Sequence, residues 1–230
     1  QLGMMTAAFD HFYLPRLHRA GFAAPNLKDI QTNEHAAGGY VIEPTPGIYE
    51  NIIVLDFKSL YPSIIQTFKI DPYSLLMKDV DTIQTLNGYK FSASLHILPD
   101  FIDELMKLRD IAKKKKDKQL SQAIKILMNS FYGVMGSYGC RFYHPDLPRA
   151  ITGSGHKLLL GSKDYLENKG LKVVYGDTDS LFVMLNDISV DDGEAQGKKI
   201  VKELNSFWKN KLKKEFKVES YLELEFEKYY

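Results

Sequence analysis

Short apolar runs, bounded by Gly, Pro, Asn and Asp, mark the segments of the chain that have the character of strands. Five strands are predicted, at residues 40–42, 51–57, 172–174, 181–185 and 222–227. The run Ile52-Ile53-Val54-Leu55 indicates that the second of these is buried on both faces. The pair Asn87-Gly88 indicates a separate hairpin.

Other segments repeat their apolar residues every three or four positions, which is typical of amphipathic helices. Helices are predicted at about residues 6–14, 121–132, 146–169 and 192–213, and one more opens at Pro99 and closes in a lysine-rich end. The helix from Pro99 and the one after it are joined by a short link, so they should form an antiparallel helical hairpin.

The order of these elements predicts the fold class. When the helical hairpin is treated as an insertion, the order is strand, helix, strand, strand, helix, strand, which is the β-α-β-β-α-β arrangement of a ferredoxin-like sheet. We therefore predict an α+β fold, with a ferredoxin-like sheet covered by helices on one face and an inserted antiparallel helical hairpin.

Composition narrows the class of protein. The chain has 230 residues, 44% hydrophobic and 26% charged, which is ordinary for a globular protein of one large or two small domains. No apolar run approaches the roughly 20 residues that span a bilayer, and no signal peptide is apparent, so we expect a cytoplasmic protein without a membrane partner. A single cysteine, Cys140, excludes an internal disulfide. Because the chain begins at Gln1 and stops at Tyr230, we expect an excised piece of a longer protein.

Three carboxylates are expected to meet on the sheet. Asp177 and Asp179 lie in the turn of the predicted hairpin at 172–185, and Asp56 ends the buried strand. Because side chains alternate along a strand, Asp177 and Asp179 should share one face, with Thr178 and Ser180 on the other. Carboxylates this close raise each other's pKa unless a cation lies between them, and Mg²⁺ is a suitable cation. A plain acidic surface turn is the alternative.

Positive charge is concentrated in the helical hairpin. Between Leu105 and Ile126 the chain has eight basic residues and two acidic ones, although its formal net charge is only +1. Polar residues repeat at helical spacing on both helices: Arg109, Lys113 and Lys116 on the first, and Gln122, Lys125, Asn129 and Tyr132 on the second. A solvated helix face is the alternative. Together with the free amides of the helix that starts after Asp56, these groups suit a site for two metals and a triphosphate.

Three segments resemble the polymerase motifs of family B DNA polymerases, in the same order. They are Asp56-Phe57-Lys58-Ser59-Leu60-Tyr61-Pro62-Ser63-Ile64-Ile65, Lys125-Ile126-Leu127-Met128-Asn129-Ser130-Phe131-Tyr132-Gly133 and Tyr175-Gly176-Asp177-Thr178-Asp179-Ser180. Arg109 and Lys113 also match the basic helix of the family's fingers. The resemblance covers nearly the whole chain and is strongest to bacterial members, around residues 12–26, 38–41 and 71–72.

The resemblance implies a division of the chain. Residues 1–39 lead into a palm, 40–98 form its first part, 99–135 form a fingers hairpin and 136–230 form the second part of the palm. A thumb and an exonuclease domain are absent from this division.

The resemblance also implies roles for individual residues. The catalytic carboxylates are Asp56, Asp177 and Asp179. For two Mg²⁺ ions it implies Asp56 and Asp179 as ligands, Asp177 close by, the Phe57 carbonyl, and Glu225 and Glu227 as a nearby acidic pair. For the nucleotide it implies Ser59, Leu60, Tyr61, Arg109, Lys113, Lys125 and Asn129. For DNA and the nascent base pair it implies Tyr132, Gly133, Thr178, Gly38 and Gly39. Tyr61 is implied to exclude a 2′-hydroxyl, with a core aromatic as the alternative for Tyr61 and Tyr132.

The implied activity is that of a DNA-directed DNA polymerase in replication and repair. It would add dNTPs to a primer 3′-hydroxyl on primer-template DNA and release pyrophosphate. A sliding clamp is an expected partner through parts beyond Tyr230, and the expected location is the bacterial cytoplasm, at the nucleoid. Without a thumb, the isolated chain is expected to bind primer-template weakly and to have little or no activity. The alternatives are a non-catalytic nucleotide- or nucleic-acid-binding module with a retained palm fold, and a reverse transcriptase or RNA-dependent polymerase, whose hairpin usually reads Tyr-x-Asp-Asp.

Overall fold

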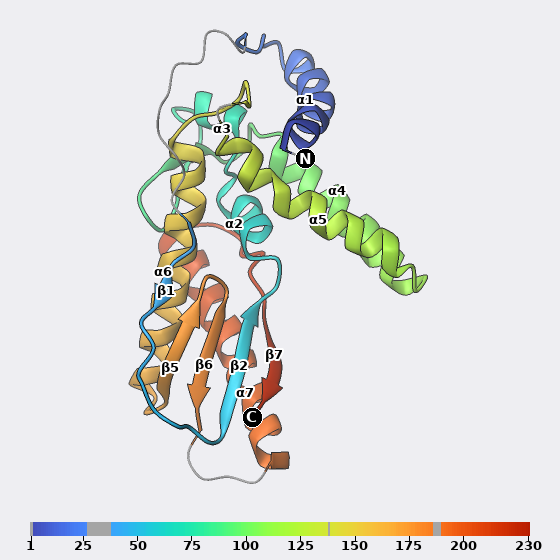
Figure 1. Ribbon diagram of the computed structural model, residues 1–230. Helices are drawn as coiled ribbons and strands as arrows, with labels where there is room; N and C mark the ends of the chain where they lie inside the picture. Colours follow the sequence, from blue (N-terminus) through green and yellow to red (C-terminus); the bar gives the residue numbers. More distant parts are fainter. Residues whose placement is uncertain (1, 27–37, 138, 186–189) are drawn as a thin grey trace. The chain divides into compact units, whose positions relative to one another are not determined.

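A computed structural model of the chain describes residues 2–26, 38–137, 139–185 and 190–230 (Figure 1). Residues 27–37, in the predicted N-terminal segment, lie outside the described residues. The chain divides into two compact units, one of residues 1–37 and 64–151 and the other of residues 38–63 and 152–230. Along the described residues, no helix is both long and apolar enough to cross a membrane.

A five-stranded sheet forms the centre of the second unit. Its strands run in the order β1 (Val41–Ile42), β5 (Lys172–Asp177), β6 (Ser180–Met184), β2 (Ile52–Phe57) and β7 (Leu224–Tyr229). Every neighbouring pair is antiparallel. The prediction of a mixed α and β protein with an antiparallel sheet is therefore confirmed.

Two long helices, α6 (Asp146–Asn168) and α7 (Val190–Lys211), cover one face of this sheet (Figure 1). Helix α7 is followed by a π-helical turn, Leu212–Phe216, so the predicted single helix ends two residues early. The helices pass closely, because a Cβ at Gly161 would lie 2.7 Å from the Trp208 ring. Trp208 Nε1 donates a hydrogen bond to Ser162 Oγ at 2.8 Å, which satisfies its one polar atom inside the core.

Strand β7 begins two residues later than predicted, and a side chain of α7 accounts for the difference. Asn205 Oδ1 accepts a hydrogen bond from Leu224 N at 2.8 Å, and Asn205 Nδ2 donates one to Leu224 O at 3.0 Å. This pair of bonds holds Leu224 against α7 at the start of the strand. The apolar and acidic alternation of residues 222–227 could not show where this contact falls.

The first unit is mainly helical. It contains α1 (Leu2–Arg19), most of α2 (Leu60–Phe68), α3 (Pro72–Leu76), α4 (Leu98–Lys114) and α5 (Lys118–Met135), with the small hairpin of β3 (Thr82–Gln84) and β4 (Lys90–Ser92). The turn at Asn87-Gly88 lies between β3 and β4, as predicted. Helices α4 and α5 form the predicted antiparallel hairpin (Figure 1), and Asp117 caps α5 by accepting from Leu120 N at 3.0 Å.

Helix α1 is longer than the predicted 6–14 and continues through Pro15. Proline inside a helix removes a backbone hydrogen bond, which is why the sequence favoured an earlier end. Aromatic packing offsets this cost, since the Phe12 ring stacks on Phe101 at 4.0 Å and lies 5.6 Å from Phe131. The guanidinium of Arg16 lies 5.0 Å from the Phe101 ring, which holds the last turns of α1 against α4.

A single buried carboxylate joins three helices of this unit. Asp71, which is 0% exposed, accepts hydrogen bonds from Tyr13 Oη at 2.7 Å and from Ser74 N at 3.0 Å. It also accepts from Leu98 N at 3.0 Å and Ile97 N at 3.3 Å. Asp71 therefore caps the N-termini of both α3 and α4 and ties them to α1.

Candidate active site

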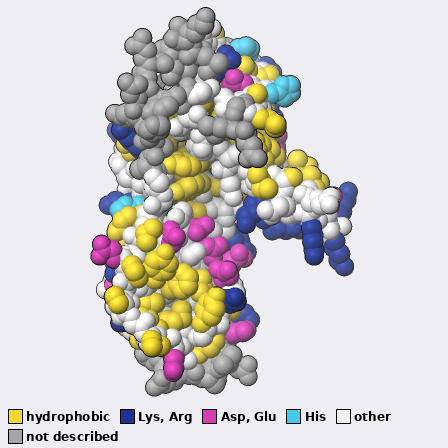
Figure 2. Space-filling model, in the orientation of Figure 1, with side chains coloured by type: hydrophobic (Ala, Val, Ile, Leu, Met, Phe, Trp, Pro, Cys, Tyr) yellow, Lys and Arg dark blue, Asp and Glu magenta, His cyan; other side chains and the backbone are white. Residues whose placement is uncertain are grey.

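Acidic side chains line up across the sheet of the second unit. Asp56 pairs with Ser180 on one side and with Glu225 on the other, and Ser180 pairs in turn with Asp177. Directly opposite residues of an antiparallel sheet project to the same face. Phe226, next to Glu225, lies against Gly197 of α7. The row of Asp177, Ser180, Asp56 and Glu225 therefore projects from the face away from α7, where Figure 2 shows acidic side chains gathered.

The predicted orientation of the hairpin residues is wrong in one respect. Strand β5 ends at Asp177 and β6 starts at Ser180, so Thr178 and Asp179 form a two-residue turn. Thr178 has a φ of 49°, in the left-handed region that such turns require. The strand alternation does not continue through the turn, and Ser180 therefore shares a face with Asp177 and Asp56.

Ser180 links two of the predicted metal ligands. Its Oγ lies 2.9 Å from Asp56 Oδ1 and 3.5 Å from Asp179 Oδ1. The Thr178 hydroxyl donates a hydrogen bond to Asp177 Oδ1 at 2.9 Å. Sequence reasoning placed Ser180 in a motif but gave it no role, because the expected alternation put it on the opposite face.

The pKa of Asp56 in this row is set by burial and by the neighbouring carboxylates. Burial, together with the negative charges of Asp179, Glu227 and Glu225, raises the pKa of Asp56 from 3.8 to about 6, against the hydrogen bond from Ser180. Burial is the largest of these causes. An ionised Asp56 is thus held among other carboxylates, which is an environment that a bound cation would relieve.

One cation of the chain already lies beside the row. Lys58 Nζ is 2.8 Å from Glu223 Oε1 and 3.3 Å from Glu225 Oε2, and these two contacts raise its pKa. Sequence reasoning did not single out Lys58. Its position two residues after Asp56 was the available signal, but its partners are 165 and more residues away in the sequence.

The oxygen donors of this site suit a hard cation, although they do not converge on one point. Carboxylates and a backbone carbonyl, such as that of Phe57, are the ligands that Mg²⁺ prefers. Within the described ranges, no three His, Cys, Asp or Glu side chains are arranged to hold a metal ion. The carboxylates of Asp177 and Asp56 instead accept hydrogen bonds from Thr178 and Ser180. The chemistry of the donors therefore fits Mg²⁺, and binding would need these side chains to turn.

Strand β1 lies against the acidic turn. Thr178 N donates to Tyr40 O at 2.8 Å, and the Tyr40 ring stacks on His156 at 3.6 Å. A Cβ at Gly39 would collide with the Thr178 side chain, so any larger residue there would force the turn to shift. Of the two predicted DNA-contacting glycines, Gly39 therefore touches the turn, whereas Gly38 is exposed with open space around it.

The predicted nucleotide contacts at the start of α2 follow Asp56 directly. Ser59 has a φ of 45° and its carbonyl accepts from Ser63 N at 3.0 Å, which turns the chain from β2 into α2. Leu60 is buried at 4% exposure, and Tyr61 is half-buried. The first amides of a helix have no partner within the helix and favour anions, so this turn suits phosphate.

The remaining predicted residues lie on the hairpin of the first unit. Lys113, Lys125 and Asn129 are exposed, and Arg109 is half-buried. The buried Nε of Arg109 has no hydrogen-bond partner in the part of the chain that the structure describes. Tyr132 is half-buried, which raises its pKa, and Gly133 is exposed. Lysine and arginine side chains gather along this hairpin in Figure 2.

Known proteins match this chain over almost its whole length. The family model "DNA polymerase family B" matches residues 8–230. DNA polymerase II of Escherichia coli (strain K12) is 44% identical over 235 residues, which cover 99% of this chain and 30% of that protein. A DNA polymerase of Thermococcus gorgonarius is 32% identical over 240 residues, covering 96% of this chain and 30% of that protein.

Solved structures agree with the sequence comparisons. The structure of the family B DNA polymerase from the archaeon Pyrobaculum calidifontis matches with a TM-score of 0.60 and 26% identity, over 94% of this chain and 28% of that one. The chain thus spans about three tenths of the length of these relatives.

Proposed function

This chain belongs to DNA polymerase family B, and on that basis we propose that it supplies the palm and fingers of a template-directed DNA polymerase. The reaction is nucleotidyl transfer from a dNTP to a primer 3′-hydroxyl, with release of pyrophosphate. The observation that carries the proposal is the row of Asp177, Ser180, Asp56 and Glu225, which lies directly before the start of α2. A sliding clamp stays a prediction.

We propose that the second unit contains the palm sheet. The order β5-β6-β2-β7, with α6 and α7 on one face, supports the ferredoxin-like arrangement predicted from the sequence. The division into 1–39, 40–98, 99–135 and 136–230 belongs to this proposal. The α4–α5 hairpin would be the fingers.

We propose that Asp56 and Asp179 hold two Mg²⁺ ions, with Asp177, Glu227 and the Phe57 carbonyl close by. Such ions, when bound, lower the pKa of a primer hydroxyl and neutralise the phosphates of the leaving group. Supporting this, burial and, to a smaller extent, the neighbouring carboxylates raise the pKa of Asp56, and a bound cation would relieve both effects. Ser180 would orient Asp56 through its hydroxyl.

The chain's own residues would position the nucleotide. Ser59 and the Leu60 amide would bind phosphate at the start of α2, where free helix amides favour anions. Tyr61 would lie under the sugar and exclude a 2′-hydroxyl. Four residues of the hairpin would contact the phosphates: Arg109, Lys113, Lys125 and Asn129. The base pair and DNA would meet Tyr132, Gly133, Thr178, Gly38 and Gly39. Positioning and charge neutralisation supply most of the catalysis in such a reaction.

Primer extension with Mg²⁺ and dNTPs tests this proposal, on a protein that contains this chain and the remaining length of its relatives. Asp179→Ala should abolish extension, whereas Asp164→Ala, an exposed carboxylate on α6, should not. Tyr61→Ala should newly admit ribonucleotides. Full extension by the Asp179→Ala protein would refute the assignment of the metal site.

The alternative is a non-catalytic nucleotide- or nucleic-acid-binding module with a retained palm fold. Under that alternative, the wild-type protein would bind Mg²⁺ and dNTP but incorporate nothing. Incorporation by wild type, lost in Asp179→Ala, would exclude it.

A further inference from the structure

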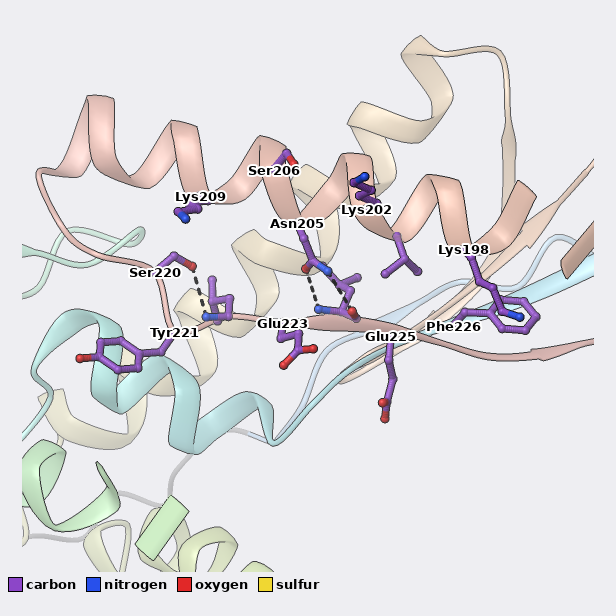
Figure 3. A pocket seen from close by; sticks show the side chains of 13 residues that line it. Lys198, Lys202, Asn205, Ser206, Lys209, Ser220, Tyr221, Glu223, Glu225 and Phe226 are labelled. Atoms are coloured by element: carbon purple, nitrogen blue, oxygen red, sulfur yellow. Dashed lines mark hydrogen bonds between the residues drawn. The ribbon is translucent and has the colours of Figure 1, made fainter. Parts of the chain in front are cut away.

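Three adjoining hollows follow helix α7 within the second unit. The first, of about 740 Å³, lies between α7 and residues 220–226 (Figure 3). The second, of about 730 Å³, shares Lys202 and Ser206 with the first. The third, of about 440 Å³, shares Lys209 and Ser220 with the first. We call the three hollows together the α7 groove.

Exposed lysines form one wall of the α7 groove. Lys198, Lys202 and Lys209 lie at i, i+4 and i+11, which on an α-helix places them in a sector about 40° wide and about 16 Å long. Lys213 and Lys217 continue the wall in and after the π-helical turn. Between them, the first hollow is lined by Asn205 and Ser206 and by no acidic side chain among the described residues of α7.

The charge of this wall is largely uncompensated. Residues 198–217 contain eight lysines, no arginine and two acidic residues, Glu203 and Glu215. Glu203 pairs with Lys169, which lies outside the groove, and Glu215 pairs with Lys211 in the second hollow, so neither pairs with a lysine of the wall. Four lysines of the wall have no carboxylate at ion-pair distance in the described part of the chain: Lys202, Lys209, Lys213 and Lys217.

The opposite wall does not supply the missing negative charge. Glu223 and Glu225 belong to the segment that lines the first hollow, but their side chains point away from α7 (Figure 3). Both pair with Lys58, at 2.8 and 3.3 Å. Of the acidic side chains that line the three hollows, Glu219 is the one left without an ion-pair partner among the described residues.

We propose that the α7 groove binds the phosphate backbone of a single-stranded nucleic acid, without regard to base sequence. Lysine binds phosphate as a point charge, without the fixed two-pronged geometry of arginine, which residues 198–217 lack. A lysine wall therefore suits phosphates that meet it in varied orientations, as those of a strand bound without regard to sequence would. A single cationic wall suits one backbone, as in other grooves that follow a single strand, while a duplex presents two backbones. Lys198 and Lys202 are about 6 Å apart along the helix axis, so neighbouring ammonium groups can reach different phosphates.

This binding is separate from the proposed polymerase site. The α7 groove lies on the helix-covered side of the sheet, whereas Asp56 and Glu225 project from the other face. A strand in the groove therefore needs neither a divalent cation nor a dNTP. Loss of strand binding in the groove can therefore be told apart from loss of nucleotidyl transfer at the proposed polymerase site.

The test is fluorescence anisotropy of a labelled 20-nucleotide single-stranded DNA of mixed sequence with the 230-residue chain, in EDTA and at several salt concentrations. If five lysines each neutralise one phosphate, log K should fall with log salt with a slope of about −3.5. In the double variant Lys209→Gln/Lys213→Gln the slope should shrink by about 1.4, which corresponds to roughly 60-fold weaker binding at about 50 mM salt.

A matched control removes two lysines elsewhere in the same unit, in the double variant Lys157→Gln/Lys228→Gln. It should bind the DNA within about twofold of wild type at the same salt. Equal weakening in both double variants would mean general charge attraction, and unchanged binding in the groove variant would overturn the proposal. Competition by poly-glutamate as effective as by unlabelled DNA of equal charge would also overturn it. Circular dichroism of each variant checks that the fold is kept.

Discussion

Replacing Asp71 by Ala should lower the free energy of unfolding of the first unit by about 3–5 kcal/mol. The carboxylate is 0% exposed and accepts from one hydroxyl and three backbone amides, at 2.7–3.3 Å. The variant leaves the Tyr13 hydroxyl and the first amides of α3 and α4 without their acceptor in a site that water does not reach.

The magnitude follows from what is lost and from what the carboxylate costs. A hydrogen bond to a charged group contributes about 1.5–3 kcal/mol, and each helix cap about 1 kcal/mol. The contributions of the four hydrogen bonds do not add in full. Burial disfavours the charged carboxylate, which raises the pKa of Asp71, and this cost offsets part of the stability that the hydrogen bonds provide. Leaving a buried donor without an acceptor costs about 1–3 kcal/mol. Four such donors, less the desolvation cost of the carboxylate itself, give a net loss of about 3–5 kcal/mol.

Urea unfolding gives the free energy, and hydrogen exchange shows where it is lost. Because the chain has two compact units, exchange of the α3 and α4 amides is needed to assign the loss to the first unit. Those amides should exchange faster in Asp71→Ala, and the exchange of strand β2 should change less.

Asp117 provides the matched control. It also caps a helix of the same hairpin, but it is exposed and accepts a single bond, from Leu120 N at 3.0 Å. Asp117→Ala should therefore cost about 1 kcal/mol. If Asp71→Ala cost no more than Asp117→Ala, the reasoning from burial and from the number of donors would be refuted.

Three further predictions concern the acidic row. Because the pKa of Asp56 is raised to about 6, this carboxyl binds its proton more tightly in the folded chain. Protonated Asp56 should therefore stabilise the fold at pH 4, and this contribution should be lost as the pH rises through 6. The free energy of unfolding of wild type and of Asp56→Asn, measured as a function of pH, would show the difference. Lys58→Met removes the counter-ion of Glu223 and Glu225. The negative charge of Glu225 near Asp56 is then no longer offset, so the midpoint of the Asp56 titration, measured by carbon NMR, should rise. Stability should change by less than about 1 kcal/mol, because the pair is exposed; an unchanged midpoint would contradict the role given to Lys58. Gly39→Ala should cost about 1–3 kcal/mol and speed exchange of the Thr178 amide, whereas Gly38→Ala has open space and should do neither.

Much of the fold could be predicted from local patterns. The buried run at 52–55 predicted β2, and the apolar runs on each side of the acidic turn predicted β5 and β6. A short apolar run is enough to indicate a buried strand, because its pattern is complete within a few residues. The helical hairpin and the turn at Asn87-Gly88 followed in the same way. The end of α1 and the start of β7 could not be placed, because aromatic packing across Phe101 and the hydrogen bonds of Asn205 decide them.

For the candidate site, too, the sequence determined some features and the tertiary structure decided the others. The sequence alone determined the family, the motifs and the identity of the carboxylates, because these reside in the order of residues. Only the tertiary structure decided which face Ser180 shares with Asp56, that Lys58 pairs with Glu223, and that Asp71 caps two helices at once. Each of these is a contact between residues far apart in the chain or across a turn that breaks the strand alternation. No local pattern of polar and apolar positions encodes such a contact, because its geometry exists only once the elements have packed.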